Sequence, residues 1–379
     1  MEIVDRISRK DWLIILLLGA ILILDWSDGN TTRALLLSIF TLFAIPVMRY
    51  AKNIGMLVIL FSISLFSFSY LTGTNTNIIS LLYVCVPCYF FYCIGSYFAD
   101  RYGENHLQII VAIIVCVYLL VTVITYINDI IYTGQLVSFS RAVYTDTDRE
   151  VVFVGDRSIL SIGMIGLPLV FFSKSKLKWV YFIVCVLSTI CSIHCLHRTP
   201  LAVALLLIIF SFFYGKNKDR NKIIPIVLIS LFIIAILYWV GSNSDIISLF
   251  QDRNSYDAQT LGDRSTRWTD AIGKLFLYPF GWKDSSVGYY VHNMWLDVDR
   301  TAGLIPFVLL LTFSIKSFFN IIKTKIIDNS LYFTMTLINI AFLASCFVEP
   351  VFEMHPTHAW MYMLFTGMQY RYCVNNTSL

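Results

Sequence analysis

The sequence LGDRSTRWTDAIGKLFLYPFGWKDSSVGYYVHNMWLDVDRTAGLIP, from Leu261 to Pro306, is a dense polar stretch in a chain that otherwise consists largely of apolar segments. It contains two arginines three positions apart, Arg264 and Arg267, and a histidine–asparagine pair, His292 and Asn293. Long hydrophobic segments precede and follow it. Polar residues packed this closely between such segments indicate chemistry at a membrane surface.

The composition indicates a membrane protein. Of the 379 residues, 58% are hydrophobic and 14% are charged, whereas an ordinary soluble domain has about 25% charged residues. Apolar runs long enough to cross a bilayer recur along the whole chain. Because backbone groups exposed to lipid must be satisfied within the segment, we expect these runs to be helices. The fold class predicted is therefore an all-α polytopic membrane protein, a single integral membrane domain covering residues 1–379.

The apolar runs predict about twelve spans, separated by short connections and two long polar loops, 133–157 and 242–301. Several of the runs contain a proline, which membrane helices tolerate. The expected spans are 11–27, 33–49, 54–72, 78–98, 107–132, 158–173, 178–196, 200–214, 223–241, 302–319, 330–348 and 357–371.

The distribution of lysine predicts the orientation of these spans. Three short connections are rich in lysine, at 174–178, 216–222 and 323–325, and all three fall on the same side if the spans alternate. Lysine-rich and arginine-rich short loops stay in the cytoplasm. We therefore expect both termini inside and both long loops outside. The basic residues before the first apolar run resemble a signal peptide, but the run ends without a small-residue cleavage site, which favours an uncleaved helix.

Cysteine does not predict a metal or redox site. The chain has nine cysteines, none of which lies in the two long loops. Cys85 and Cys88 form a C-x-x-C pattern, but it lies within an expected span and has no second pair. We interpret the cysteines as small buried apolar residues.

Arg264 and Arg267 lie on one face of an expected helix from Ser265 to Leu277, because residues at i and i+3 are neighbours on a helix. Two guanidinium groups on one face can bind a diphosphate, since each presents a planar fork of donors. The alternative is a solvated helix face on which the arginines pair with residues such as Asp270.

Aromatic residues surround the turn that ends this helix. Proline stops the helix at Pro279 and Gly281 permits a tight turn. Trp282, Tyr290 and Trp295 then offer flat apolar faces that suit sugar rings. The alternative is equally open, because tryptophan and tyrosine also concentrate at membrane interfaces for reasons unrelated to sugars.

His292 and Asn293 precede a further expected helix. Asn293 is suited to cap its start, and the positive end of the helix dipole would keep His292 neutral. A neutral imidazole can accept a proton from a hydroxyl group or orient it; the alternative is a structural histidine. Arg198, at the edge of an expected span, completes the candidate set, since an arginine there is costly unless it is paired, snorkels to the interface or has a function.

No metal or other cofactor is expected. His194 and His197 lack a carboxylate or cysteine pattern that would complete a site. Asp297 and Asp299 are two positions apart on a helix and do not face each other. A further group on the last outside turn is suited to a metal by residue type, but we expect it to line the cavity or cap helices. That group is Glu349, Glu353, His355 and His358.

The polar stretch resembles the O-antigen ligase and O-antigen polymerase superfamily of bacterial inner membranes. The resemblance rests on Gly-Asp-Arg264, Trp268, Pro279, Gly281, His292-Asn293 and Gly303, about 45 residues, and less specifically on the span pattern. Arg198, in the sequence Leu196 to Pro200, matches an arginine at a span edge in that superfamily. Ligases often have a second glycine three residues after the one that corresponds to Gly303, whereas this chain has Pro306. The sequence around Asn293 is more similar to that of the polymerases.

The resemblance implies a fold similar to the C-type membrane glycosyltransferases and a site facing the periplasm. It implies a donor glycan on undecaprenyl pyrophosphate, with the growing chain passed to a lipid-linked repeat unit. His292, Arg264 and Arg198 would be catalytic, and Arg267, Asn293, Trp282, Trp295 and Tyr290 would bind substrate. Further expected partners are membrane lipids and a chain-length regulator protein; no nucleic acid is expected.

Two other functions are considered. A ligase would pass the glycan to the lipid A core instead. A transporter for lipid-linked oligosaccharides would need ionisable residues within its spans to mark a pathway, and the interiors of these spans are nearly free of charge. The sequence does not determine the sugars, the linkage or the oligomeric state.

Overall fold

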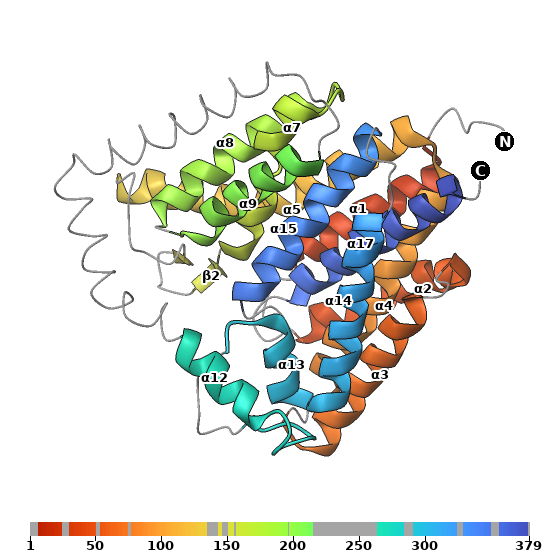
Figure 1. Cartoon of the computed structure of the whole chain (residues 1–379), viewed down its shortest axis with the longest axis vertical. Coiled ribbons are helices and arrows are strands. Elements are labelled where there is room, and N and C mark those ends of the chain that lie inside the picture. The colour runs from red at the N-terminus through yellow and green to blue at the C-terminus, as the bar shows by residue number, and fades with distance from the viewer. Residues whose placement is uncertain are drawn as a thin grey trace.

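The computed structural model describes residues 7–24, 30–50, 54–74, 77–134, 143–145, 151–154, 157–195, 197–214, 264–283, 291–323, 329–349 and 356–377. This part of the chain is helical apart from one short antiparallel pair of strands, and Figure 1 shows the helices gathered into one bundle. The helices in the N-terminal half are α1 (Arg9–Leu24), α2 (Asn30–Ala44), α3 (Ile54–Leu71), α4 (Ile78–Arg101), α5 (Glu104–Thr133), α6 (Leu160–Gly163), α7 (Gly166–Phe172), α8 (Lys178–His194) and α9 (Thr199–Tyr214). Those nearer the C-terminus are α12 (Arg264–Lys274), α13 (Met294–Ala302), α14 (Leu304–Lys323), α15 (Ser330–Val348) and α17 (Pro356–Thr377).

Short elements complete the described chain. The 3-10 helices are η1 (Ile45–Tyr50) and η2 (Arg157–Ile159). The strands β1 (Val143–Thr145) and β2 (Val151–Val154) lie within the first long loop, which the sequence had given no reason to expect as a hairpin.

The described helices confirm that the chain is mainly α-helical, and several of them have the length and apolar composition of membrane spans. Four of them are long and apolar enough to cross a bilayer: α3, α4, the part of α5 from Glu104 to Ile131, and α15. Four shorter apolar helices accompany them, at Leu160–Phe172, Lys178–His194, Thr199–Phe213 and Leu304–Asn320. The expected span 223–241 lies outside the described residues. Twelve spans therefore stay a prediction.

Three expected spans differ from the observed helices. The segment expected at 33–49 is divided between α2, which ends at Ala44, and the 3-10 helix η1. The segment expected as one span at 158–173 is broken between α6 and α7, where Gly163 packs against Ser188 of α8. The segment expected at 302–319 begins only after Gly303, which ends α13 and precedes α14. The last two differences follow from close packing and backbone geometry, which hydropathy does not report.

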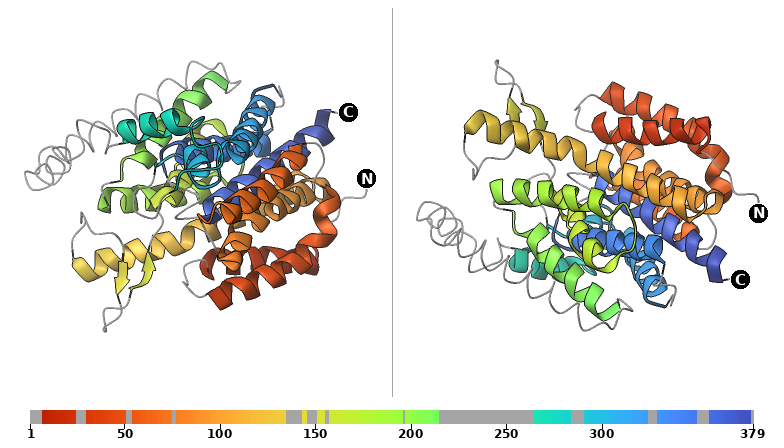
Figure 2. Two further views of the ribbon diagram at one scale, coloured as in Figure 1. Left: turned by 90° about the horizontal axis from the view of Figure 1, so that it is seen from below. Right: turned by 90° about the horizontal axis from the view of Figure 1, so that it is seen from above.

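The core of the bundle is built around α4 and α17, which lie side by side (Figure 2). A β-carbon at Gly95 would fall 1.9 Å from the carbonyl oxygen of Leu364, and one at Gly367 would fall 2.3 Å from that of Tyr92. Glycine at these positions therefore lets the two backbones touch, as small residues do at helix contacts in membranes. Ser96 adds a hydrogen bond from its hydroxyl to the carbonyl of Gly367 at 3.2 Å.

One end of the bundle, which we call the terminal end, brings residue 11 together with residues near 101, 329 and 372. Asp11 is buried and accepts hydrogen bonds from Tyr97 at 2.7 Å and from Tyr102, while Arg101 Nε lies 3.1 Å from it. Asn329 caps α15 and donates to Glu104 at 2.6 Å. Figure 1 shows both chain termini at this end.

The opposite end, which we call the site end, brings together residues near 74, 197, 280, 301 and 349. Thr74 donates to the carbonyl of Thr301 at 2.9 Å, and Phe68 stacks on Phe280 at 5.8 Å. Helices α12 and α13 lie here, away from the termini (Figure 1). The connections expected on opposite sides of the membrane thus lie at opposite ends of the bundle, although the compartment that each end faces stays a prediction.

Candidate functional site

Glu349 is the centre of the candidate site, because side chains from two other segments of the chain converge on it. Its carboxylate oxygen Oε1 accepts hydrogen bonds from His197 Nε2 and from Thr199 Oγ1, each at 3.1 Å. Arg264 Nη2 lies 3.6 Å from the same oxygen. The turn before α9, the start of α12 and the end of α15 therefore meet at one carboxylate, at the site end of the bundle (Figure 1).

Local sequence explains why these residues stand at helix ends. Glu349 precedes Pro350, and a residue before proline is driven out of the helical conformation; its φ of −125° and ψ of 149° are extended. Thr199 likewise begins α9 with Pro200 after it, a position where proline costs no helical hydrogen bond. The side chains of Glu349 and Thr199 are thus presented at helix ends.

The electrostatics of Glu349 follow from these neighbours. Burial alone would raise the pKa of its carboxyl. The hydrogen bond from His197 and the positive charge of Arg264 outweigh burial and lower the pKa from 4.5 to about 2. Glu349 is therefore a permanent negative charge at neutral pH.

His292 lies beside this carboxylate and is held in an unusual backbone conformation. Its φ is 57°, and it is the one residue other than glycine in the described chain with a positive φ. Burial lowers its pKa from 6.5 to about 4, with Arg264 and Arg267 adding to the effect and Glu349 opposing it. The imidazole is therefore neutral at pH 7, as expected, but the cause is burial and two arginines rather than a helix dipole. Its Nδ1 atom is buried without a hydrogen-bond partner.

Asn293 fixes the position of His292. As predicted, it caps α13: its side-chain oxygen accepts a hydrogen bond from the backbone N–H of Leu296 at 3.1 Å. Its amide nitrogen also donates to the carbonyl of Phe347 at 3.1 Å, which ties the cap to the last turn of α15. In this structure Asn293 is a positioning residue that joins two of the elements around the site.

The turn after α12 holds the arginine helix against the rest of the site end. The backbone N–H of Trp282 donates to the carbonyl of Arg300 at 2.9 Å, and that of Leu304 donates to the carbonyl of Pro279 at 3.0 Å. Gly281 has a φ of 101° and Gly303 a φ of 83°. A β-carbon at Gly303 would fall 2.2 Å from the carbonyl oxygen of Pro279. Both glycines are thus required by backbone conformation and close approach.

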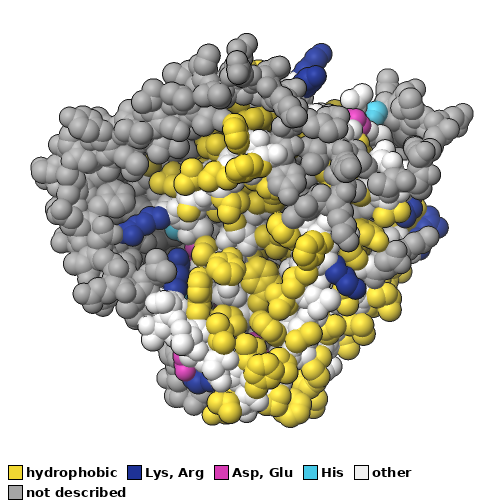
Figure 3. All heavy atoms as spheres, viewed as in Figure 1, with side chains coloured by type: hydrophobic (Ala, Val, Ile, Leu, Met, Phe, Trp, Pro, Cys, Tyr) yellow, Lys and Arg dark blue, Asp and Glu magenta, His cyan; other side chains and the backbone are white. Residues whose placement is uncertain are grey.

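The other two candidate arginines lie at the edges of this cluster. Arg267 is half-buried, one turn along α12 from Arg264, and its charge acts on His292. Arg198 is exposed and stands between His197 and Thr199, both of which bind Glu349. Figure 3 shows basic, histidine and acidic side chains close together at the left of a largely hydrophobic face, with further charged side chains at its lower left and at its top and right edges.

The predicted aromatic residues do not form one exposed surface. Trp295 is buried, donates to Ser314 Oγ at 3.1 Å and packs on Phe347, so its ring belongs to the core. Trp282 is half-buried, with Lys274 Nζ 4.4 Å above its ring. Tyr290 lies outside the described residues.

The acidic residues of α13 point to different partners, in agreement with their spacing. Asp297 accepts a hydrogen bond from the backbone N–H of Val291 at 2.9 Å, and Asp299 accepts one from Trp282 Nε1 at 3.2 Å. Burial raises the pKa of Asp299 from 3.8 to about 6.

The described part of the chain has no group of three or more histidine, cysteine or acidic residues arranged for a metal. Of the acidic and histidine group that the sequence singled out, Glu353 and His355 lie outside the described residues. His358 is buried against Phe342 and hydrogen-bonded to Tyr118 at 2.7 Å, so it belongs to the core. The prediction that no metal is used stays open.

Sequence reasoning missed how His197 and Glu349 combine. It considered His197 only as a metal ligand and placed Glu349 among residues that line a cavity or cap a helix. The two residues are 152 positions apart, and only the packing of α9 on α15 brings them together. The neighbouring His194 has a separate partner, Asp129, at 2.7 Å.

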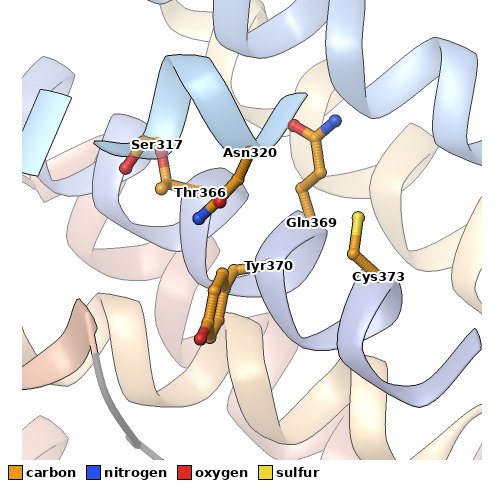
Figure 4. Close-up of a pocket in the computed structure, with 6 residues that line it drawn as sticks. All are labelled: Ser317, Asn320, Thr366, Gln369, Tyr370 and Cys373. Carbon is orange, nitrogen blue, oxygen red and sulfur yellow. The ribbon is translucent and has the colours of Figure 1, made fainter. Parts of the chain in front are cut away.

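A pocket between α14 and α17 lies away from this cluster and is lined by Ser317, Asn320, Thr366, Gln369, Tyr370 and Cys373 (Figure 4). Its lining carries no charged side chain. It therefore offers no counter-charge to a diphosphate, and the cluster at Glu349 is the stronger candidate.

Comparison of the sequence with models of known protein families gives no match, and comparison with curated proteins gives none either.

Proposed function

We propose that this chain is a membrane glycosyltransferase that moves a glycan from a polyprenyl diphosphate carrier to an acceptor hydroxyl group. The observation that carries the proposal is the convergence of Arg264, Arg267, a neutral His292 and Glu349 at one end of a bundle of apolar helices. The lipid tail of such a substrate needs an apolar environment, and its diphosphate needs fixed cations. Transfer of its glycan to a hydroxyl group needs a proton acceptor.

The arginines bind the diphosphate in this proposal. In the reaction the acceptor oxygen attacks the anomeric carbon, the bond from that carbon to the diphosphate oxygen breaks, and the diphosphate leaves with its electron pair. Arginine presents fixed donors where that negative charge develops, which stabilises the transition state. Arg264 and Arg198 take this role, and Arg267 assists.

Glu349 and His197 hold Arg264 in place. One oxygen of the carboxylate, Oε1, lies 3.6 Å from Arg264 and accepts hydrogen bonds from His197 and Thr199. An arginine fixed in this way loses little conformational entropy when it binds a diphosphate. Glu349 is therefore a positioning residue rather than a ligand of the substrate.

His292 takes the proton of the acceptor hydroxyl group. Its lowered pKa keeps the imidazole neutral at pH 7, so a ring nitrogen is open to accept a proton. The positive φ and the cap at Asn293 set its direction. The acceptor oxygen thus gives its proton to His292 as it forms the new glycosidic bond to the anomeric carbon.

The particular reaction that we propose is surface-polysaccharide polymerisation: the growing glycan passes from undecaprenyl pyrophosphate to a lipid-linked repeat unit at the periplasmic face of a bacterial inner membrane. The resemblance of the 261–306 stretch to O-antigen polymerases supports it. A chain-length regulator protein is the proposed partner. The second candidate is the ligase reaction, with the lipid A core as acceptor, which the same residues would serve.

The test is transfer by purified protein in nanodiscs that contain a lipid-linked donor and acceptor. His292→Ala should abolish transfer, because general base catalysis contributes about 10²–10⁴ in rate. His106→Ala is the matched control, since His106 lies near the start of α5 at the terminal end. Normal transfer by His292→Ala would contradict the proposal.

A deletion strain separates the two acceptors. Loss of long chains with one repeat unit still attached to the core indicates a polymerase. Bare core, with polymer left on the lipid carrier, indicates a ligase.

A further inference from the structure

The segment from the middle of α12 to Phe280 exposes large apolar side chains, although it follows a charged helix start. Phe276 is 79% exposed and Leu277 is 74% exposed. Ile272, Tyr278 and Phe280 are exposed as well. We call these five residues the α12 apolar end. Contiguous exposed apolar groups of this kind mark a surface that meets lipid or another protein.

The α12 apolar end is attached to a helix long enough to cross the membrane. Phe280 stacks on Phe68 of α3, with 5.8 Å between ring centroids. Phe68 lies three residues before Leu71, the last residue of α3. At about 1.5 Å per residue the contact is about 4–5 Å inside the end of this apolar helix. Phe280 therefore lies level with the last turn of this apolar helix.

The lipid-facing surface of α3 continues toward the same place. Leu71 is 76% exposed and Tyr70 is exposed beside it. A second connection, from the backbone N–H of Leu304 to the carbonyl of Pro279 at 3.0 Å, joins the segment to the start of α14. The α12 apolar end thus adjoins the ends of two apolar helices that meet at the site end.

We propose that the α12 apolar end is inserted among the acyl chains of the membrane, with α12 lying at the interface. The polar groups are arranged for this. Lys274 binds Asp270 at 2.8 Å and lies over the ring of Trp282, so its charge has partners within the protein. Lysine and tryptophan at an interface behave in this way, with apolar stems in lipid and polar tips in water.

The consequence is that α12 has two ends with different partners. Its first turn carries Arg264 and Arg267 at the site, and the segment that follows its last turn is held in lipid. The lipid contact does not depend on the proposed reaction. It would fix the height of the two arginines relative to the lipid headgroups, where the diphosphate of a membrane-bound carrier lies.

The lipid contact is tested by fluorescence quenching on the full-length protein in nanodiscs. Phe276→Cys is labelled with bimane, and Thr266→Cys is the matched control, because Thr266 is exposed at the arginine end of α12. The parent protein is labelled in parallel, since its described cysteines are buried or half-buried. Lipids carrying a nitroxide on the acyl chain and aqueous iodide serve as the two quenchers.

We expect the label at 276 to be quenched by the nitroxide lipids and protected from iodide, and the label at 266 to show the reverse. Leu277→Cys repeats the measurement if the first variant is produced poorly. Quenching of the 276 label by iodide, as strong as that at 266, would overturn the proposal. Protection from both quenchers would show a protein surface over the segment, such as a second copy of the chain, and would overturn it as well.

Discussion

Replacing Glu349 by glutamine should destabilise the site while preserving its shape. Glutamine keeps an oxygen that can accept from His197 and Thr199, but it removes the negative charge beside Arg264. Arg264 is partly buried, with 28% of its side chain exposed, so it would be left without that counter-charge in a site that also holds Arg267.

The size of the effect follows from the pKa of Glu349. The lowering from 4.5 to about 2 corresponds to about 3 kcal/mol, since one pKa unit is about 1.4 kcal/mol. Because the pKa is lower in the folded chain, this stabilisation is complete above about pH 4.5 and is lost as the pH falls through about 2. At pH 7 the whole contribution is present.

The assay is thermal unfolding in detergent at pH 7, followed with a thiol-reactive dye. Eight of the nine cysteines are buried, so the dye reports unfolding. With an unfolding entropy of about 2.1 cal/mol/K per residue, about 3 kcal/mol lowers the midpoint of this chain by about 4 °C. Asp270→Asn is the matched control, since it removes the same charge from a more exposed pair with Lys274, which is worth about 0.3–0.5 kcal/mol.

A second substitution isolates the pair. If the charge of Arg264 is what Glu349 offsets, then adding Arg264→Gln to Glu349→Gln should cost less than the sum of the two single substitutions. A midpoint for Glu349→Gln no lower than that of Asp270→Asn would refute the electrostatic role of Glu349.

Three further predictions concern the same end of the molecule. Asp299→Asn should raise the unfolding midpoint at pH 7. Burial raises the pKa of Asp299 from 3.8 to about 6, so the charged form is disfavoured by about 3 kcal/mol. The gain should disappear below about pH 4, where the native carboxyl is protonated, and a pH-independent gain would contradict this cause. Arg264→Lys keeps the charge but loses the planar fork, so glycan transfer in nanodiscs should fall about 100-fold or more; full activity would instead indicate a general electrostatic role. A reporter active only in the periplasm should be active when fused near Ser286 and silent when fused near Asn217, and the reverse pattern would remove the site from the proposed compartment.

The sequence by itself determined much of the local helical structure. Hydropathy identified α3, α4, α5 and α15 closely, because a segment of about 20 apolar residues has little alternative to a helix in a bilayer. The cap at Asn293 was also predicted from the sequence. The helix expected from Ser265 to Leu277 is observed as α12, which ends earlier, at Lys274. Each depends on residues within a few positions of one another, so the sequence carries the full cause.

Only the tertiary structure decided which of these local elements share a site. Glu349 contacts His197, which is 152 positions away in the chain, and Arg264, which belongs to another segment. The packing of distant helices determines both contacts. The same packing buries Trp295, which sequence reasoning had assigned to sugar binding, and lowers the pKa of His292 through burial and two arginines. Charge and burial act through space, so a linear pattern identifies the residues of this site but not the carboxylate around which they assemble.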